Sequence, residues 1–178
     1  RLMLPAASVT LDVEDLRPSL EFPERVVDAT HRVLDLFAKH DVRASVYVVG
    51  ELAERRPELV RRAASEGHEV GLHAWAHAPV PTLTPEAFIA ETRRGRALLQ
   101  DLSGQEVVGY RAPMMSLVPE ASWAIPLLRE MGFAYSSSVL PALSPLYGWP
   151  GLPRRPFRWL DGPLEFPCPL VRLGPIDL

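Results

Sequence analysis

The stretch His68-Glu-Val-Gly-Leu-His73-Ala-Trp-Ala-His77 joins a short strand pattern to two histidines that are four residues apart. Residues 69–72 are a brief strand candidate, and Trp75 is expected to pack in the core. On a helical turn after this strand, the imidazoles of His73 and His77 would project to one side and could share a metal ion. The pair alone also suits a solvated helix face, so its meaning depends on the rest of the chain.

Outward from this stretch, strand and helix patterns alternate along the chain. Strands are predicted over residues 8–13, 44–49, 69–72, 107–110 and 133–135. Helices are predicted over residues 24–39, 57–66, 84–102 and 119–131. Strands that alternate with long helices indicate crossover connections and a parallel sheet, whose binding groups collect at the carboxyl ends of the strands.

Polar clusters follow three of these strands. The acidic run Asp12-Val-Glu14-Asp15 ends the first strand, the two histidines follow the third, and Arg111 follows the fourth. Two imidazoles and one carboxylate leave a coordination position open for water, which is how a catalytic zinc site is built. Three carboxylates within four residues also repel one another, and a cation would relieve that repulsion. The alternatives are a capping or loop-solvating acidic run and, for Arg111, a surface charge beside a proline.

Composition limits the kind of protein and its partners. The 178 residues, 47% hydrophobic and 23% charged, predict one globular domain over residues 1–178. The net charge of −3 comes from interleaved acids and bases, so a neutral or sugar-like partner is expected rather than nucleic acid or anionic lipid. No apolar run approaches the roughly 18 residues of a membrane span. The single cysteine excludes an internal disulfide framework, and the prolines crowd residues 79–85 and 141–169, where irregular loops are expected.

Four segments resemble, in order, motifs of the polysaccharide deacetylase family, which is carbohydrate esterase family 4 and shares the nodulation-factor deacetylase domain. The segments are Thr10-Leu-Asp-Val-Glu-Asp15, His68 to His77, Tyr110-Arg-Ala-Pro113 and Tyr135-Ser-Ser-Ser-Val-Leu-Pro141. The first is most similar to the branch with an Asp-Val-Glu-Asp motif, which is linked to bacterial exopolysaccharide systems. The resemblance covers Ser8 to about Leu173.

This resemblance implies an α/β fold, namely a distorted, incomplete (β/α) barrel, here expected to lack its C-terminal strands because the chain stops short. It also implies a divalent metal, commonly zinc, and an N-acetylated polysaccharide or oligosaccharide substrate from which acetate is released. Two alternatives stay open: hydrolysis of small cyclic amides or ureides on the same fold, and a non-catalytic carbohydrate-binding relative. The compartment stays open too, with the cytoplasmic or periplasmic face of a bacterial cell as the expectation.

The resemblance carries specific roles to residues of this chain. Asp12 matches the catalytic base, and Arg111 matches the arginine that orients this base by a charge-assisted hydrogen bond. His73 and His77 match the histidine ligands of the metal. The backbone N–H of Met114 corresponds to the donor that stabilises the tetrahedral oxyanion.

Two features of this chain depart from the family pattern. The third metal ligand is either Glu14 or Asp15, because Val13 stands where many relatives have a second aspartate. Strand alternation favours Glu14, which would share a face with Asp12, whereas Asp15 would serve if the chain leaves the strand after Val13. In addition, no histidine follows Tyr135 to protonate the leaving amine, so the chain is truncated, takes the proton from another group, or has lost activity.

Overall fold

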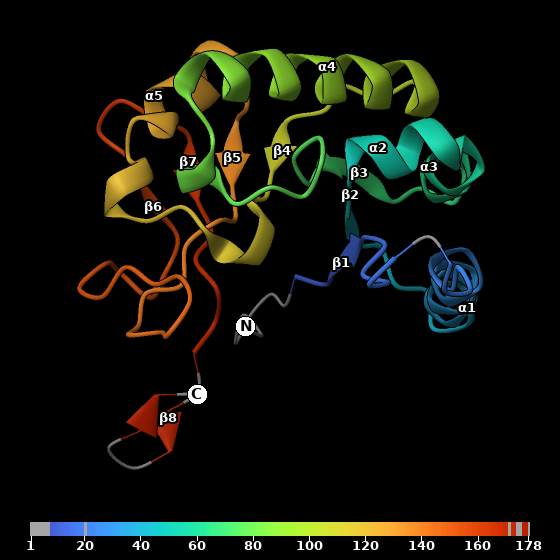
Figure 1. Cartoon of the computed structure of the whole chain (residues 1–178). Helices are drawn as coiled ribbons and strands as arrows, with labels where there is room; N and C mark the ends of the chain where they lie inside the picture. Colours follow the sequence, from blue (N-terminus) through green and yellow to red (C-terminus); the bar gives the residue numbers. More distant parts are fainter. Residues whose placement is uncertain (1–7, 20, 171, 174–175, 178) are drawn as a thin grey trace, which may run out of the picture.

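A curved, mostly parallel sheet forms the centre of the computed structural model, which describes residues 8–19, 21–170, 172–173 and 176–177 (Figure 1). The strand order is β1-β2-β3-β4-β5-β7-β6, and only β6 runs antiparallel to its neighbour. Within the described residues β1 and β6 are the two edges, so the sheet is not closed. The predicted incomplete (β/α) barrel is therefore confirmed.

The seven strands of this sheet are short. Their bounds are β1 Thr10–Val13, β2 Ser45–Val48, β3 Glu69–Leu72, β4 Gly109–Tyr110, β5 Tyr135–Ser136, β6 Phe157–Arg158 and β7 Leu164–Glu165. A separate antiparallel ribbon, β8 Arg172–Leu173 and β9 Ile176–Asp177, lies apart from the sheet near the C-terminus (Figure 1). The prediction that residues 1–178 form one domain stays a prediction.

Helices and single turns connect the strands and lie outside the sheet (Figure 1). The α-helices are α1 Val26–Lys39, α2 Gly50–Arg55, α3 Pro57–Ser65, α4 Pro85–Ser103 and α5 Ala124–Glu130. The 3-10 turns are η1 Val80–Thr82, η2 Pro113–Met115 and η3 Pro119–Ala121. No helix in the described part of the chain has the length and apolar character needed to cross a bilayer.

Capping residues set the ends of α4 as the sequence predicts. The side chain of Thr84 accepts a hydrogen bond from the N–H of Ala87, and Gly104 ends the helix in the left-handed conformation with φ 68°. The helix predicted over residues 119–131 is wrong at its start, because the α-helix begins only at Ala124. Pro126 explains the difference: it lacks an N–H and is tolerated in the first turn of a helix but not in its interior.

Two features of the connections were not predicted. Helix α2 was not predicted, since six residues are too few to show a helical period. The proline-rich residues 141–169 are irregular as expected, apart from the short strands β6 and β7.

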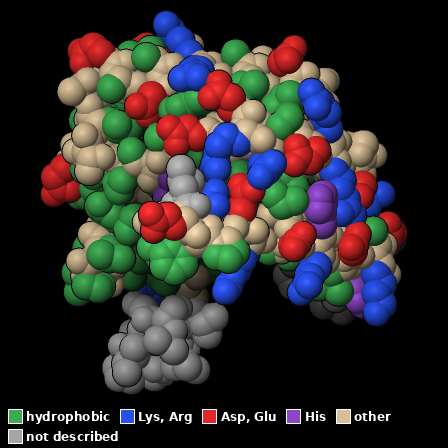
Figure 2. Space-filling model, turned by 45° about the vertical axis from the view of Figure 1, so that its right-hand side comes forward, with side chains coloured by type: hydrophobic (Ala, Val, Ile, Leu, Met, Phe, Trp, Pro, Cys, Tyr) green, Lys and Arg blue, Asp and Glu red, His purple; other side chains and the backbone are tan. Residues whose placement is uncertain are grey.

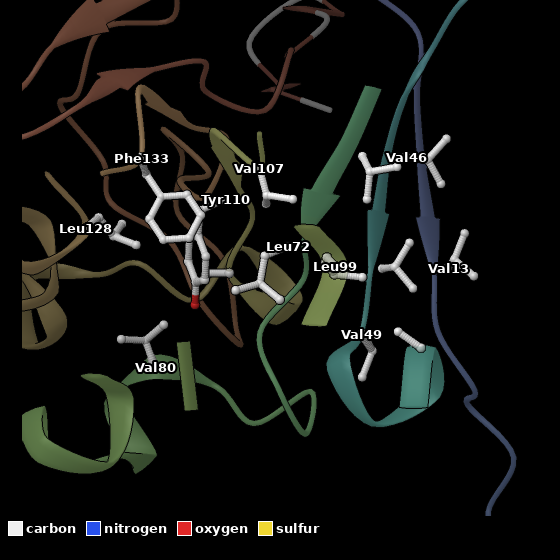
Figure 3. Packing of buried hydrophobic residues seen from close by; sticks show 14 of the residues in the cluster. Val13, Val46, Val49, Leu72, Val80, Leu99, Val107, Tyr110, Leu128 and Phe133 are labelled. Atoms are coloured by element: carbon white, nitrogen blue, oxygen red, sulfur yellow. The ribbon is translucent and has the colours of Figure 1, made fainter. Parts of the chain in front are cut away.

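Apolar side chains from strands and helices pack into one core (Figure 3). Leu72 of β3 and Leu99 of α4 are both 0% exposed. Burying each of these side chains stabilises the fold by roughly 1.5–3 kcal/mol. Gly95 allows α4 to approach this closely, because a Cβ there would lie 2.7 Å from Cδ1 of Leu72.

The parallel register gathers the carboxyl ends of the strands at one edge, which we call the rim. Leu72 pairs with Tyr110, and Tyr110 pairs with Ser136, so the residues that follow β3, β4 and β5 leave the sheet at the same level. The acidic run after β1, the histidines and Arg111 therefore meet at the rim. On the face in Figure 2, acidic and basic side chains are interspersed rather than gathered by sign.

Candidate metal centre and active site

Three side chains from two distant parts of the chain converge at the rim. Glu14, His73 and His77 each offer one ligand atom, and these atoms all lie within 4.8 Å of one another. Nε2 of His73 is 3.3 Å from Oε2 of Glu14, and Nε2 of His77 contacts the same oxygen. Within the residues that the structure describes, this is the one group of His, Cys, Asp and Glu side chains arranged to hold a metal ion.

The donor set fits a divalent cation such as zinc. Ligand atoms of a tetrahedral zinc site with bonds of about 2.1 Å lie roughly 3.4 Å apart, close to the 3.3 Å between His73 and Glu14. Oε2 of Glu14 is buried and accepts no hydrogen bond from any described residue, although two imidazole nitrogens face it. Contact with His73, followed by contact with His77, holds the pKa of the Glu14 carboxyl well below its ordinary range, so this ligand is an anion.

The backbone fixes which nitrogen of His73 faces Glu14. Nδ1 of His73 lies 2.9 Å from the carbonyl oxygen of Arg111. Because a carbonyl only accepts, Nδ1 carries the proton and Nε2 keeps its lone pair for a metal. His73 is 2% exposed, so this orientation is fixed by packing as well.

The segment that carries the two histidines is not helical, so the prediction of a helical turn is wrong. Ala74 and His77 instead adopt left-handed conformations, with φ of 57° and 55°. The N–H groups of Gly50 and Glu51, at the start of α2, donate to the carbonyls of Ala74 and Trp75 at 3.0 and 2.9 Å. This unpredicted short helix therefore holds residues 73–77, which we call the histidine loop.

Trp75 packs in the core between the histidines, as the sequence predicts, and is 6% exposed. The guanidinium of Arg94 lies 3.7 Å from the centre of its ring, which is a cation–π contact. Gly50 also lies against this ring, because a Cβ at Gly50 would be 2.4 Å from Cε3 of Trp75. The loop geometry thus depends on a glycine in a different element.

Arg111 holds Asp12 beside Glu14, His73 and His77, which together we call the metal group. Nη1 of Arg111 donates to Oδ1 of Asp12 at 2.6 Å, whereas Oδ2 lies 4.0 Å from Nε2 of His73. One carboxylate oxygen is therefore fixed by the arginine, and the other is directed to the metal group.

Arg111 is 7% exposed, which excludes the alternative of a surface charge. Its Nε and Nη2 donate to the carbonyl and hydroxyl oxygens of Ser137, and Nη1 also donates to the hydroxyl of Thr10. The guanidinium lies 4.2 Å from the centre of the Tyr47 ring. Every donor nitrogen of the side chain is thus engaged, and its plane is fixed.

The structure separates Asp15 from the metal group. Its Oδ2 lies 2.8 Å from Nη2 of Arg17 and 3.3 Å from Nη2 of Arg55. Of the two carboxylates weighed from the sequence, Glu14 is therefore the one that the fold brings to the histidines.

Met114 lies on η2, directly after the strand that leads to Arg111. Its φ is 56° and that of Met115 is 53°, so two consecutive residues adopt the left-handed conformation, which is unfavourable for side chains of this size. Strained backbone of this kind is concentrated at functional sites. The role of the Met114 N–H as an oxyanion donor stays a prediction.

Several residues that support Arg111 were not singled out from the sequence. Thr10 and Ser137 stood inside the quoted motifs without a role, and Tyr47 lies in a strand that is apolar apart from the hydroxyls of Tyr47 and Ser45. Glu165, buried behind Ser138, lies in the proline-rich region, and nothing in its local sequence indicates that it is buried.

Comparison with known proteins agrees with this geometry. Residues 6–135 match the family model described as polysaccharide deacetylase. The peptidoglycan-N-acetylglucosamine deacetylase of Bacillus cereus is 29% identical over 119 residues, which are 66% of this chain and 40% of that protein.

Two solved structures show the same fold. A Mycobacterium smegmatis protein described as a provisional polysaccharide deacetylase has a TM-score of 0.70 and 25% identity, over 90% of this chain and 57% of that one. A Bacillus anthracis pseudoenzyme of carbohydrate esterase family 4 has a TM-score of 0.53 and 19% identity, over 64% of this chain and 37% of that one. The chain thus spans less than two thirds of the length of each of these relatives.

Proposed function

The chain belongs to the polysaccharide deacetylase family, and on that premise we propose that it hydrolyses N-acetyl groups of an N-acetylated polysaccharide and releases acetate. The observation that carries the proposal is the convergence of Glu14, His73 and His77 beside an aspartate fixed by a buried arginine. A divalent ion, zinc in our proposal, would be held by these three side chains. When bound, it supplies Lewis acidity for the amide carbonyl and favours hydroxide over water.

Asp12 acts as the general base in this proposal. Its Oδ2 is free of Arg111 and is directed to the centre of the site, where it takes a proton from the attacking water. Arg111 fixes Oδ1, so the free lone pairs of the carboxylate keep one direction. The N–H of Met114, on the turn after Arg111, donates to the oxyanion that forms from the amide carbonyl.

The leaving amine needs a proton as the carbon–nitrogen bond breaks. Among the residues of this chain we assign that step to Asp12, which is protonated once it has taken the proton of water. No histidine follows His77 in this sequence to take the role that a histidine has in the family pattern.

The proposed substrate is a bacterial surface polysaccharide with N-acetylglucosamine units, from an exopolysaccharide system. The Bacillus cereus relative is named for N-acetylglucosamine in peptidoglycan, which supports the sugar but leaves the polymer to experiment. The first motif, Asp12-Val-Glu-Asp15, supports the exopolysaccharide branch.

Acetate release tests the proposal directly. The full-length protein with one equivalent of zinc is expected to liberate acetate from an N-acetylglucosamine oligosaccharide, and His73→Ala is expected to abolish both release and metal binding. His40→Ala is the matched control, because His40 is an exposed residue at the end of α1. Absence of acetate release from wild-type protein that holds one zinc would refute the proposal.

One second candidate is a carbohydrate-binding relative without catalysis. The Bacillus anthracis structure shows that this fold also occurs in a pseudoenzyme. Oligosaccharide binding by calorimetry, unchanged in His73→Ala and without acetate release, would select this function.

A further inference from the structure

We propose that Glu165, on β7, is a positioning residue for Arg111 and, through it, for Asp12. This inference rests on the proposed function, because it assigns a role within the same site. Glu165 is 0% exposed and lies one strand beyond β5, where it is the register partner of Ser136. It has no contact with the metal group and acts through the backbone that follows β5.

One peptide group links Glu165 to Arg111. Oε1 of Glu165 accepts a hydrogen bond from the N–H of Ser138 at 2.7 Å. The carbonyl of Ser137, in the same peptide group, accepts from Nε of Arg111 at 3.2 Å. Because a peptide group is planar and rigid, the carboxylate and the guanidinium hold its two ends and fix each other's position.

Further contacts hold this segment in place. Oε1 of Glu165 also accepts from the N–H of Val139 at 3.2 Å, and Oε2 accepts from Nε1 of Trp159 at 3.4 Å. The hydroxyls of Ser136 and Ser138 share a hydrogen bond of 2.7 Å, and Oγ of Ser138 accepts from the N–H of Ala112. The segment after β5 is thus tied both to Glu165 and to the residue that follows Arg111.

The partners of Glu165 explain why the residue is an acid. Three N–H groups point at its two oxygens, so the site requires a group that only accepts. A glutamine would place an NH2 group against at least one of these donors. Burial raises the pKa of the Glu165 carboxyl, whereas the donated hydrogen bonds favour the anion. Burial of an acid is unfavourable, and the three donated hydrogen bonds offset part of this cost while they hold the segment after β5 in one geometry.

The decisive experiment observes Arg111 rather than overall stability. In the full-length protein, the side-chain Nε–H resonance of Arg111, assigned with Arg111→Lys, is expected to exchange slowly with water. In Glu165→Gln this exchange is expected to be about tenfold faster, because a neutral amide accepts more weakly than a carboxylate and turns its NH2 group to at least one of the three donors, so the Ser137–Ser138 peptide group is held less firmly. The matched control is Glu91→Gln on α4, another carboxyl whose pKa burial raises but which does not contact the segment after β5 in any described hydrogen bond.

A second variant tests the same linkage from the other side. Ser137→Ala removes the hydroxyl that accepts from Nη2 of Arg111 and leaves Glu165 intact, so it is expected to accelerate exchange at Arg111 as well. Unchanged Arg111 exchange in either Glu165→Gln or Ser137→Ala would overturn the inference, and this readout requires no turnover. With an active wild type, Glu165→Gln is also expected to lower kcat about tenfold at unchanged KM and zinc content. Inactive wild type with accelerated exchange in both variants would refute the proposed function and leave the positioning role supported.

Discussion

Replacement of Arg111 by lysine tests whether this arginine fixes the orientation of the Asp12 carboxylate. Arg111 donates from three nitrogens to Asp12, Thr10 and Ser137, with a distance of 2.6 Å to the carboxylate of Asp12. A lysine places all its donors on one nitrogen and cannot reach Ser137 and Asp12 in the same geometry. A hydrogen bond to a charged group contributes about 1.5–3 kcal/mol, so loss of this bond is expected to lower kcat roughly 10- to 160-fold.

The assay is acetate release from an N-acetylglucosamine oligosaccharide, with zinc content measured on the same samples. Zinc content is expected to stay at the wild-type level, because the contact of Arg111 with His73 is made by the backbone carbonyl and survives the substitution. Arg61→Lys on α3 is the control, since Arg61 is exposed. A kcat within twofold of wild type for Arg111→Lys would show that the arginine does not orient the base.

Three further predictions concern the metal, the histidine loop and pH. Glu14→Ala is expected to lower zinc affinity in equilibrium dialysis by more than the roughly 100-fold that loss of an outer-shell partner can cost, because it removes a direct ligand. Asp15→Ala should bind zinc like wild type, and equal loss in both variants would contradict the ligand assignment. Gly50→Val should displace Trp75 and lower the free energy of unfolding by about 1–3 kcal/mol, and an unchanged urea midpoint would contradict the packing argument. Burial lowers the pKa of His68, so the native state binds its proton less readily than the unfolded chain, and stability should be full above the unfolded pKa of about 6.5 and fall below it. His68→Gln should flatten that fall in urea unfolding, and an unchanged slope would exclude His68 as its source.

The parts of the fold that the sequence predicts are those encoded locally. Apolar alternation identified β1 to β5 near their observed positions, and the parallel arrangement followed from the helices between them. The acidic run, the histidines and Arg111 all stand at the ends of predicted parallel strands. Their meeting at the rim could therefore be predicted from the sequence, without knowledge of the side-chain positions. The short strands β6 and β7 were not predicted, because prolines surround both and neither follows a predicted helix, as the equally short β4 and β5 do.

The details of the site depend on contacts that residue type does not encode. Left-handed backbone at Ala74, His77 and Met114 is unusual for these residues and is imposed by tertiary contacts, such as those that α2 makes with the histidine loop. The choice between Glu14 and Asp15 likewise depended on where the arginines Arg17 and Arg55 lie. Only the folded arrangement shows which acid is already neutralised by a permanent cation.

Asp12 and Glu14 are two residues apart, yet their surroundings suit them to different chemical roles. Between them Val13, 2% exposed, anchors the end of β1 in the core, so both carboxylates are directed to the rim. Arg111 neutralises Asp12 from one side and leaves its second oxygen free, as a base requires. Glu14 has no arginine partner among the described residues, and its buried oxygen faces Nε2 of both His73 and His77 instead. A carboxylate held by an arginine with one oxygen free suits the proposed base, whereas a carboxylate that faces only imidazole nitrogens suits the proposed metal ligand, so the placement of one arginine separates the two roles.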